Sequence, residues 1–189
     1  MSRERVARLA PGDTNAAAAA AALLSRELGD GLYRPAWLLE DAASPGAGVW
    51  LARPDAPVGA AVARMLGPGD GAYYDAFGDA VAGLLRDAAG SFEALAVEPE
   101  HRGAGLGSLL ARTSLDWMRE RGCAVAVTLS WRPPAGSRSA GLFRRLGMRE
   151  GPTVERFYLE ESVRDGWTCP VCRGPCTCAA TLFTLPLGR

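Results

Sequence analysis

The sequence predicts a single α/β domain. Its 189 residues suit one domain of ordinary size, large enough to bury a hydrophobic core. Hydrophobic residues make up 48% and charged residues 22% of the chain, which is typical of globular proteins. Short apolar runs alternate with segments of helical periodicity, and neither an internal repeat nor a linker interrupts them. We therefore treat residues 1–189 as one domain, with a cysteine-rich insert at 165–179.

Local signals define the elements of the first half. Thr14 can cap a helix over 15–28, which Gly29 ends, and the alanines within it favour a helix by propensity. The segment 30–45 can form a loop or a short helix. Strands are predicted at 6–9, 48–53 and 58–65, with the turn-forming residues 54–57 between the last two, and a helix is predicted at 75–88.

Patterns in the second half are clearer. Apolar residues recur at helical spacing from Leu106 to Trp117, which predicts a helix over 105–121. The segment 123–129 is nearly all apolar, as expected for a strand buried on both faces. The remaining predicted elements are strands at 91–97, 153–159 and 180–185 and a helix at 137–146.

The charge balance excludes several classes of function. There are 21 basic and 21 acidic residues, so the net charge is zero, which argues against a dedicated nucleic-acid binder and a polybasic membrane-surface protein. All basic residues are Arg, so no lysine can act as a Schiff base or general base. The start of the chain has no signal-peptide pattern, and the longest apolar run, 16–24, is too short to span a bilayer. We expect a cytoplasmic protein without a membrane partner.

A glycine-rich turn, Arg102-Gly-Ala-Gly-Leu-Gly107, stands between a predicted strand and a predicted helix. Glycines allow a sharp turn and close approach of a ligand to the backbone. The free amides at the start of the following helix form an anion site that suits a pyrophosphate. A tight connection without any ligand is the alternative. The turn has no Lys for a Walker A loop, and its glycine spacing differs from that of a Rossmann fingerprint.

The segment from Leu95 to Leu110, LAVEPEHRGAGLGSLL, resembles motif A of the GCN5-related N-acetyltransferases, the GNAT superfamily. In that motif Arg/Gln-x-x-Gly-x-Gly/Ala follows the family's fourth strand. Downstream, residues 142–148, LFRRLGM, are similar to the family's Leu-Tyr-x-x-Leu-Gly-Phe signature. The order of predicted elements agrees with the family as well.

This resemblance implies the GNAT fold, a mixed and mostly antiparallel central sheet flanked by helices and splayed at its fourth and fifth strands. It implies acetyl-CoA as co-substrate, with its pyrophosphate on the turn and its pantetheine arm along the fourth strand. The acetyl group would pass to a primary amine of a small molecule or a protein N-terminus by direct attack. The corresponding residues here are Leu95, Ala96 and Val97 of the strand, Arg102, Gly103, Ala104, Gly105, Leu106 and Gly107 of the turn, and Ser108 at the helix start.

Glu93 is the main candidate for the general base. It lies on the strand beside the expected thioester, and we expect its side chain on the same side as Leu95 and Val97. A partly desolvated carboxylate there could have a raised pKa and accept the amine's proton. A structural carboxylate, or one that holds the acceptor's ammonium group, is the alternative. Other residues that could line an acceptor cleft, or belong to the core and the solvated surface, are Trp37, Tyr73, Tyr74, Asp75 and Asp79.

The sequence departs from the family at the proton donor. Family members often use a Tyr in the penultimate helix to protonate the departing thiolate, and Phe143 stands in that place. The Asn that often opens the same helix region is replaced by Gly136. A water or Tyr158 could substitute as the acid. These departures also leave room for a non-catalytic acyl-CoA-binding sensor.

Four of the five cysteines form the pattern Cys169-x2-Cys172-x3-Cys176-x-Cys178. Four thiolates can complete a closed tetrahedral site for a structural Zn²⁺ ion. An iron–sulfur cluster, redox disulfides and unliganded thiols are the alternatives. We expect this loop to shape acceptor access or a homodimer contact. A zinc-knuckle nucleic-acid adaptor is disfavoured because the chain has no net charge and no basic stripe near the cysteines.

Overall fold

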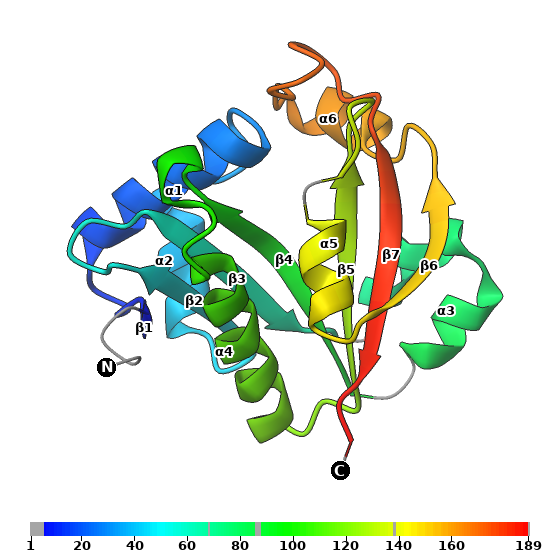
Figure 1. Ribbon diagram of the computed structural model, residues 1–189, viewed down its shortest axis with the longest axis horizontal. Coiled ribbons are helices and arrows are strands. Elements are labelled where there is room, and N and C mark those ends of the chain that lie inside the picture. The colour runs from blue at the N-terminus through cyan, green and yellow to red at the C-terminus, as the bar shows by residue number, and fades with distance from the viewer. Residues whose placement is uncertain (1–5, 68, 86–87, 138, 189) are drawn as a thin grey trace.

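The computed structural model describes residues 6–67, 69–85, 88–137 and 139–188 (Figure 1). Its centre is a seven-stranded sheet in the order β1-β2-β3-β4-β5-β7-β6. Strands β4 and β5 pair in parallel, and the other neighbours pair antiparallel, which confirms the mixed, mostly antiparallel sheet. The strands are β1 (Val6–Arg8), β2 (Ala47–Ala52), β3 (Gly59–Met65), β4 (Ala89–Val97), β5 (Val125–Arg132), β6 (Arg149–Val154) and β7 (Ala179–Pro186).

Helices cover both faces of the sheet. The side chains of α1 and α2 join one buried apolar cluster, and those of α4 and α5 join another on the opposite face (Figure 1). None of the helices in the described ranges is long and apolar enough to cross a membrane. The helices are α1 (Thr14–Leu28), α2 (Pro35–Ala43), α3 (Asp79–Leu84), α4 (Leu106–Glu120), α5 (Ala140–Arg145) and α6 (Leu159–Asp165), with 3-10 segments η2 (Asp70–Phe77) and η3 (Pro99–His101).

The alanine run forms much of the buried face of helix α1. Its buried positions include four alanines between Ala16 and Ala21, whose small side chains allow close packing against the sheet. The helix is capped by Asp13, whose carboxylate accepts a hydrogen bond from the Ala16 amide at 2.9 Å. The prediction of Thr14 as the cap was therefore wrong by one residue. The uncertain segment that follows forms α2, which begins at Pro35, a residue well suited to a first helical turn.

Two predicted elements differ in the structure. The expected helix over 75–88 is divided at Gly78, whose φ of 95° separates η2 from α3; residues 86 and 87 lie outside the described part of the chain. The expected strand over 153–159 ends at Val154 in β6. Arg156 then takes a left-handed φ of 55°, and the chain turns into α6. The apolar residues that suggested a strand pack instead against the aromatic cluster near η2.

Strands β4 and β5 part at the centre of the sheet. Their parallel pairing runs from Ala89 with Val125 to Phe92 with Thr128 and stops there. At the same point β4 contains a β-bulge against β3, because Val62 pairs with Ala94 and Ala63 with Phe92. Glu93 is the extra residue. Beyond it, β3 is the one strand in the described part of the chain that pairs with β4, so the other edge of β4 has no neighbouring strand there. Bulges commonly redirect side chains next to active sites.

Candidate active site

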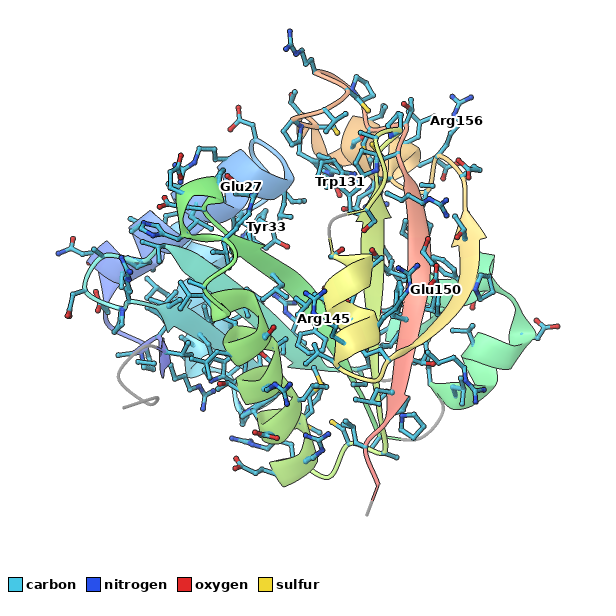
Figure 2. All side chains as sticks on the ribbon, in the orientation of Figure 1. Glu27, Tyr33, Trp131, Arg145, Glu150 and Arg156 are labelled. Atoms are coloured by element: carbon cyan, nitrogen blue, oxygen red, sulfur yellow. The ribbon has the colours of Figure 1, made fainter. Side chains whose placement is uncertain are left out.

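A cavity of about 1150 Å³ opens where β4 and β5 diverge. Figure 2 shows Tyr33, from the segment between α1 and α2, and Trp131, from β5, on opposite sides of this opening. The glycine turn and the start of α4 line one part of the cavity. Six aromatic residues, which we call the aromatic end, line another part: Tyr33, Trp37, Tyr73, Trp131, Tyr158 and Trp167.

The glycine turn has the backbone geometry of an anion site. Gly103 and Gly105 both have a φ of 81°, a left-handed conformation that favours glycine. Within the described residues, the backbone amides of 103–108 donate to no protein acceptor. A Cβ on Gly105 would meet no protein atom within 4 Å, so open space lies beside these amides. Six of the seven predicted residues of the turn and helix start line the cavity, and Ala104 does not.

The predicted pantetheine strand also faces the cavity. Leu95, Ala96 and Val97 all line it, on the stretch of β4 that β5 has left. The Val97 carbonyl accepts a hydrogen bond from Arg102 Nε at 2.9 Å, and the Arg102 guanidinium also pairs with Glu27. Arg102 therefore joins the end of β4 to α1 at the mouth of the turn.

Glu93 lies at the first position after β4 and β5 separate. Its carboxylate contacts the Ser91 hydroxyl, and its carbonyl accepts a hydrogen bond from Tyr33 OH at 3.1 Å. The expectation that its side chain shares a face with Leu95 and Val97 was wrong, because the bulge shifts the alternation by one residue. Leu95 and Val97 pack towards α4, whereas Glu93 lies with Ser91 on the opposite face. The side chain is exposed in the cavity rather than desolvated.

A second carboxylate, Glu161 of α6, lines the aromatic end. It accepts a hydrogen bond from Tyr73 OH at 2.9 Å, and burial raises the pKa of its carboxyl group. Burial also raises the pKa of Tyr33, and the charges of Glu93 and Glu161 raise it further, so both carboxylates lie near this phenol. Sequence reasoning missed Tyr33 and Glu161. The strand predicted over 153–159 ends before Glu161 and gives no indication of α6, and no local pattern marks either residue.

The other predicted residues of an acceptor cleft divide into two groups. Trp37 and Tyr73 line the cavity. Tyr74 is buried in the aromatic core near η2, and Asp75 and Asp79 are exposed outside the cavity lining.

Tyr158 also lines the cavity, immediately before α6. Its ring lies 6.4 Å from that of Trp167 and packs against the cysteine cluster. Burial raises the pKa of its hydroxyl, so the group stays protonated at neutral pH. The neutral hydroxyl carries a proton, and its raised pKa makes it a weaker acid than a free tyrosine.

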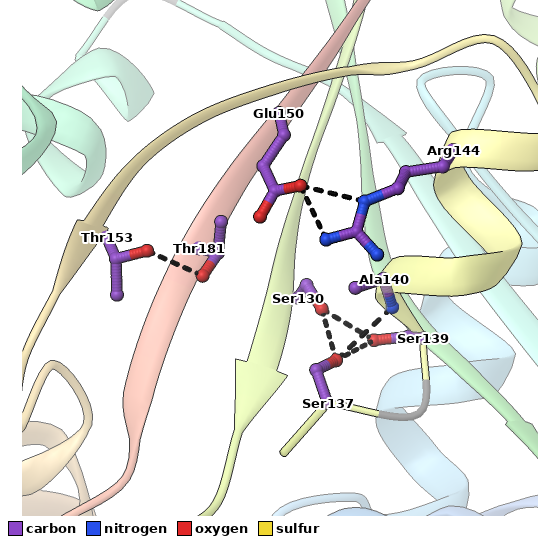
Figure 3. A network of polar contacts seen from close by, with 8 residues as sticks. All are labelled: Ser130, Ser137, Ser139, Ala140, Arg144, Glu150, Thr153 and Thr181. Carbon is purple, nitrogen blue, oxygen red and sulfur yellow. Dashed lines mark hydrogen bonds and ion pairs between the residues drawn. The ribbon is translucent and has the colours of Figure 1, made fainter.

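The start of α5 also lines the cavity. Phe143 is buried between Phe92 and Phe183, with ring centroids 6.3 and 5.5 Å away, and carries no proton to donate. Three hydroxyls lie beside the helix start, those of Ser130, Ser137 and Ser139 (Figure 3). Ser137 Oγ accepts a hydrogen bond from the Ala140 amide at 3.2 Å. These serines supply the polar groups of a helix start where the family often has Asn.

The four cysteines of the C-terminal pattern come together in the loop between α6 and β7. Their sulfur atoms all lie within 4.8 Å of one another, and those of Cys172 and Cys178 are 3.6 Å apart. All are free thiols, so no disulfide competes for them. Hydrogen bonds, first among them that of the Thr177 hydroxyl, lower the pKa of Cys172 to about 7, whereas burial raises that of Cys176 to about 11. The cluster could hold a metal ion.

Comparisons with known proteins agree with this geometry. The sequence matches the acetyltransferase (GNAT) family over residues 19–148, more than half of the chain. No curated protein matches it significantly.

Several solved structures share the fold at low sequence identity. The NatC complex bound to Gag peptide and CoA superposes with a TM-score of 0.68 at 16% identity, covering 97% of this chain and 98% of that chain. NAA60 of Arabidopsis thaliana in complex with acetyl-CoA gives 0.68 at 12% identity, covering 96% and 97%. The GphF GNAT-like decarboxylase in complex with isobutyryl-CoA gives 0.64 at 23% identity, covering 97% and 100%. With the family match, the parted strands and the glycine turn, these findings show that the chain belongs to the acetyltransferase (GNAT) family.

Proposed function

We propose that this protein is an N-acetyltransferase that moves the acetyl group of acetyl-CoA to a primary amine. The observation that carries the proposal is the juxtaposition of three features in one cavity. These are free amides at the glycine turn, a strand edge released from its neighbour, and the Glu93 carboxylate at the point of separation.

The two parts of acetyl-CoA have matching partners here. Backbone amides from Gly103 to Ser108 would bind the diphosphate, aided by the positive end of α4. The free edge of β4 at Leu95–Val97 would form hydrogen bonds with the amide groups of the pantetheine arm. A strand edge suits this role because it presents unpaired backbone donors and acceptors. The thioester would then lie in the gap next to Glu93.

Glu93 would act as the general base. The acceptor nitrogen attacks the thioester carbonyl carbon, a C–N bond forms, and the C–S bond breaks as the CoA thiolate leaves. The nitrogen must lose a proton to become neutral, and a carboxylate on the acceptor side of the sheet can accept it directly or through a water. Two observations support this role: the bulge turns the Glu93 side chain away from the α4 face, and the Glu93 charge raises the pKa of Tyr33, a residue of the aromatic end.

Tyr158 would supply the proton that the thiolate takes up. Its protonated hydroxyl lines the same cavity, and Phe143 cannot serve because its side chain has no hydroxyl. The aromatic end would bind the acceptor. The cysteine cluster would hold Zn²⁺, which completes a closed thiolate site and takes no part in the reaction.

The test combines turnover with binding. Release of CoA from acetyl-CoA is measured against a broad panel of primary amines and peptides with free N-termini, and acetyl-CoA binding is measured by calorimetry. Turnover with at least one amine, lost in Glu93→Gln while acetyl-CoA still binds, supports the proposal. Tight binding without turnover on any amine would identify an acyl-CoA-binding sensor instead. Release of carbon dioxide from a carboxylated acyl-CoA would favour the chemistry of the GphF relative.

A further inference from the structure

The cysteine cluster has the donor set and spacing of a tetrahedral metal site. At a Zn–S distance of about 2.3 Å, the sulfurs of a regular tetrahedron lie about 3.8 Å apart. The observed separation of 3.6 Å between Cys172 and Cys178, and the limit of 4.8 Å for all four sulfurs, are close to this value. A closed set of four thiolates is typical of structural zinc.

The backbone of the loop is arranged around these sulfurs. The amide of Cys172 donates to Cys169 Sγ and the amide of Thr177 donates to Cys172 Sγ, both at 3.4 Å. Such bonds stabilise the negative charge that a metal-bound thiolate carries. Arg173 takes a left-handed φ of 57°, which allows the tight turn between Cys172 and Cys176. Between α6 and β7 the loop contains no helix or strand that would hold this conformation.

Two walls of the acceptor end meet at this loop. The backbone of Thr168 exchanges two hydrogen bonds of 2.9 Å with Asp30, in the segment that follows α1. The Trp167 ring packs so closely on Gly29 that a Cβ there would lie 2.8 Å from it. On the other side, the Cys176 amide donates to Ser162 Oγ of α6 at 2.8 Å. The loop therefore joins the segment that carries Tyr33 to the helix that carries Glu161.

The loop also lines the cavity directly. Trp167, Pro170 and Val171 all belong to its lining, and so does Tyr158, which packs against the cysteines. By contrast, the glycine turn and β4 are held by α4, α1 and β3, and have no bond to the cysteine loop among the described residues. The cluster is thus placed to control one end of the cavity and not the other.

We propose that Cys169, Cys172, Cys176 and Cys178 bind one zinc ion whose role is to fix the acceptor end of the cavity. Loss of the ion frees the Asp30–Thr168 bridge and the Ser162 contact, so the two walls separate. Acceptor recognition then weakens, whereas the acetyl-CoA end keeps its geometry. The consequence for the acceptor rests on the proposed transferase function, but the metal site and its effect on the walls do not.

The first test is of the metal. Protein purified under reducing conditions should contain one zinc ion per chain by elemental mass spectrometry. Replacement by Co²⁺ should give the absorption of a tetrahedral thiolate complex. Cys172→Ser should lower the zinc content, and Cys123→Ala, at a cysteine in the core just before β5, is the control that should keep it. Iron in place of zinc, or no metal in reduced protein, would overturn the proposal.

The second test is of the walls and needs no substrate. Hydrogen exchange is compared between zinc-loaded and chelator-treated protein. The amides of Asp30, Thr168 and Cys176 should exchange faster without metal, whereas those of α4 should not change. Unchanged exchange at these amides would show that the ion does not brace the cavity.

The third test uses the amine with the highest turnover in the panel. Metal removal should raise its KM by about tenfold or more, as expected when two backbone hydrogen bonds of the wall are lost. The calorimetric Kd of acetyl-CoA should stay within about twofold, a change below 0.5 kcal/mol. Ser162→Ala removes the contact between the loop and α6. It should keep its zinc and still raise this KM, which separates the effect of the wall contact from that of metal binding itself. An equal loss of acetyl-CoA affinity would refute the division into two ends.

Absence of turnover with every amine would refute the proposed function, while the metal content and exchange data would still decide the metal site.

Discussion

Replacing Gly105 with Val is the sharpest test of the diphosphate site. Gly105 has φ 81° and ψ 0°, and an L side chain in this left-handed conformation costs about 1–2 kcal/mol. At about 2–4 °C per kcal/mol for a domain of this size, we expect Tm to fall by about 2–8 °C. The new methyl groups project into the space beside the free amides and exclude the diphosphate. Losing two hydrogen bonds to a charged group, each about 1.5–3 kcal/mol, weakens acetyl-CoA binding by about 100-fold or more.

Calorimetry with acetyl-CoA measures this loss, and Gly122→Val is the control. Gly122 follows α4 at its opposite end, has a φ of 77°, and a Cβ there would also meet no protein atom within 4 Å. It does not line the cavity. The control should lower Tm by a similar amount and keep its acetyl-CoA affinity. If Gly105→Val binds as tightly as the wild type, or both variants lose affinity equally, the assignment of the turn to the diphosphate is refuted.

Three further predictions follow from the site. Glu93→Gln should lower kcat by about 10²–10⁴-fold, the range expected for loss of a general base, with an unchanged Kd for acetyl-CoA by calorimetry; an unaltered kcat would exclude Glu93 as the base. Phe143→Ala should lower the free energy of unfolding by about 3–5 kcal/mol in urea titrations, since its ring is buried among Phe92 and Phe183; a loss under about 1 kcal/mol would contradict this packing. Burial raises the pKa of Glu161 in the folded state, so its favourable contribution is complete below the unfolded pKa and disappears as pH rises through the folded pKa. Glu161→Gln should therefore raise Tm at neutral pH relative to the wild type, with a difference that shrinks in acid; a constant difference across pH would argue against this titration.

Some features could be predicted because contiguous residues encode them. The helical spacing from Leu106 to Trp117 gave α4, and the apolar run after Cys123 gave β5, whose first residues are buried. The glycine turn was recognisable because its left-handed positions favour glycine. The cysteine spacing likewise predicted a cluster that the fold brings together.

Other features depended on turns and long-range contacts that a periodic pattern of apolar residues does not reveal. Phe157 and Tyr158 extend the apolar pattern of a strand, yet they pack from a turn because Arg156 redirects the chain into α6. Glu161 was not predicted as a site residue, because it lines the cavity only through α6, a helix that the sequence pattern did not indicate. Tyr33 is similar, because its hydroxyl reaches a carbonyl 60 residues further along the chain.

The amino-acid order alone was enough to indicate the family, the turn that suits a diphosphate and the sulfur ligands, because each is written in a short segment whose chemistry is local. Only the tertiary structure decided the direction of the Glu93 side chain. It also decided how the cysteine loop joins two walls of the cavity. The pairing of β3 with β4 creates the bulge, and the bonds of Thr168 to Asp30 and of Cys176 to Ser162 connect distant parts of the chain. Contacts of this kind arise from packing between separate elements, and no single segment contains the information that sets their register.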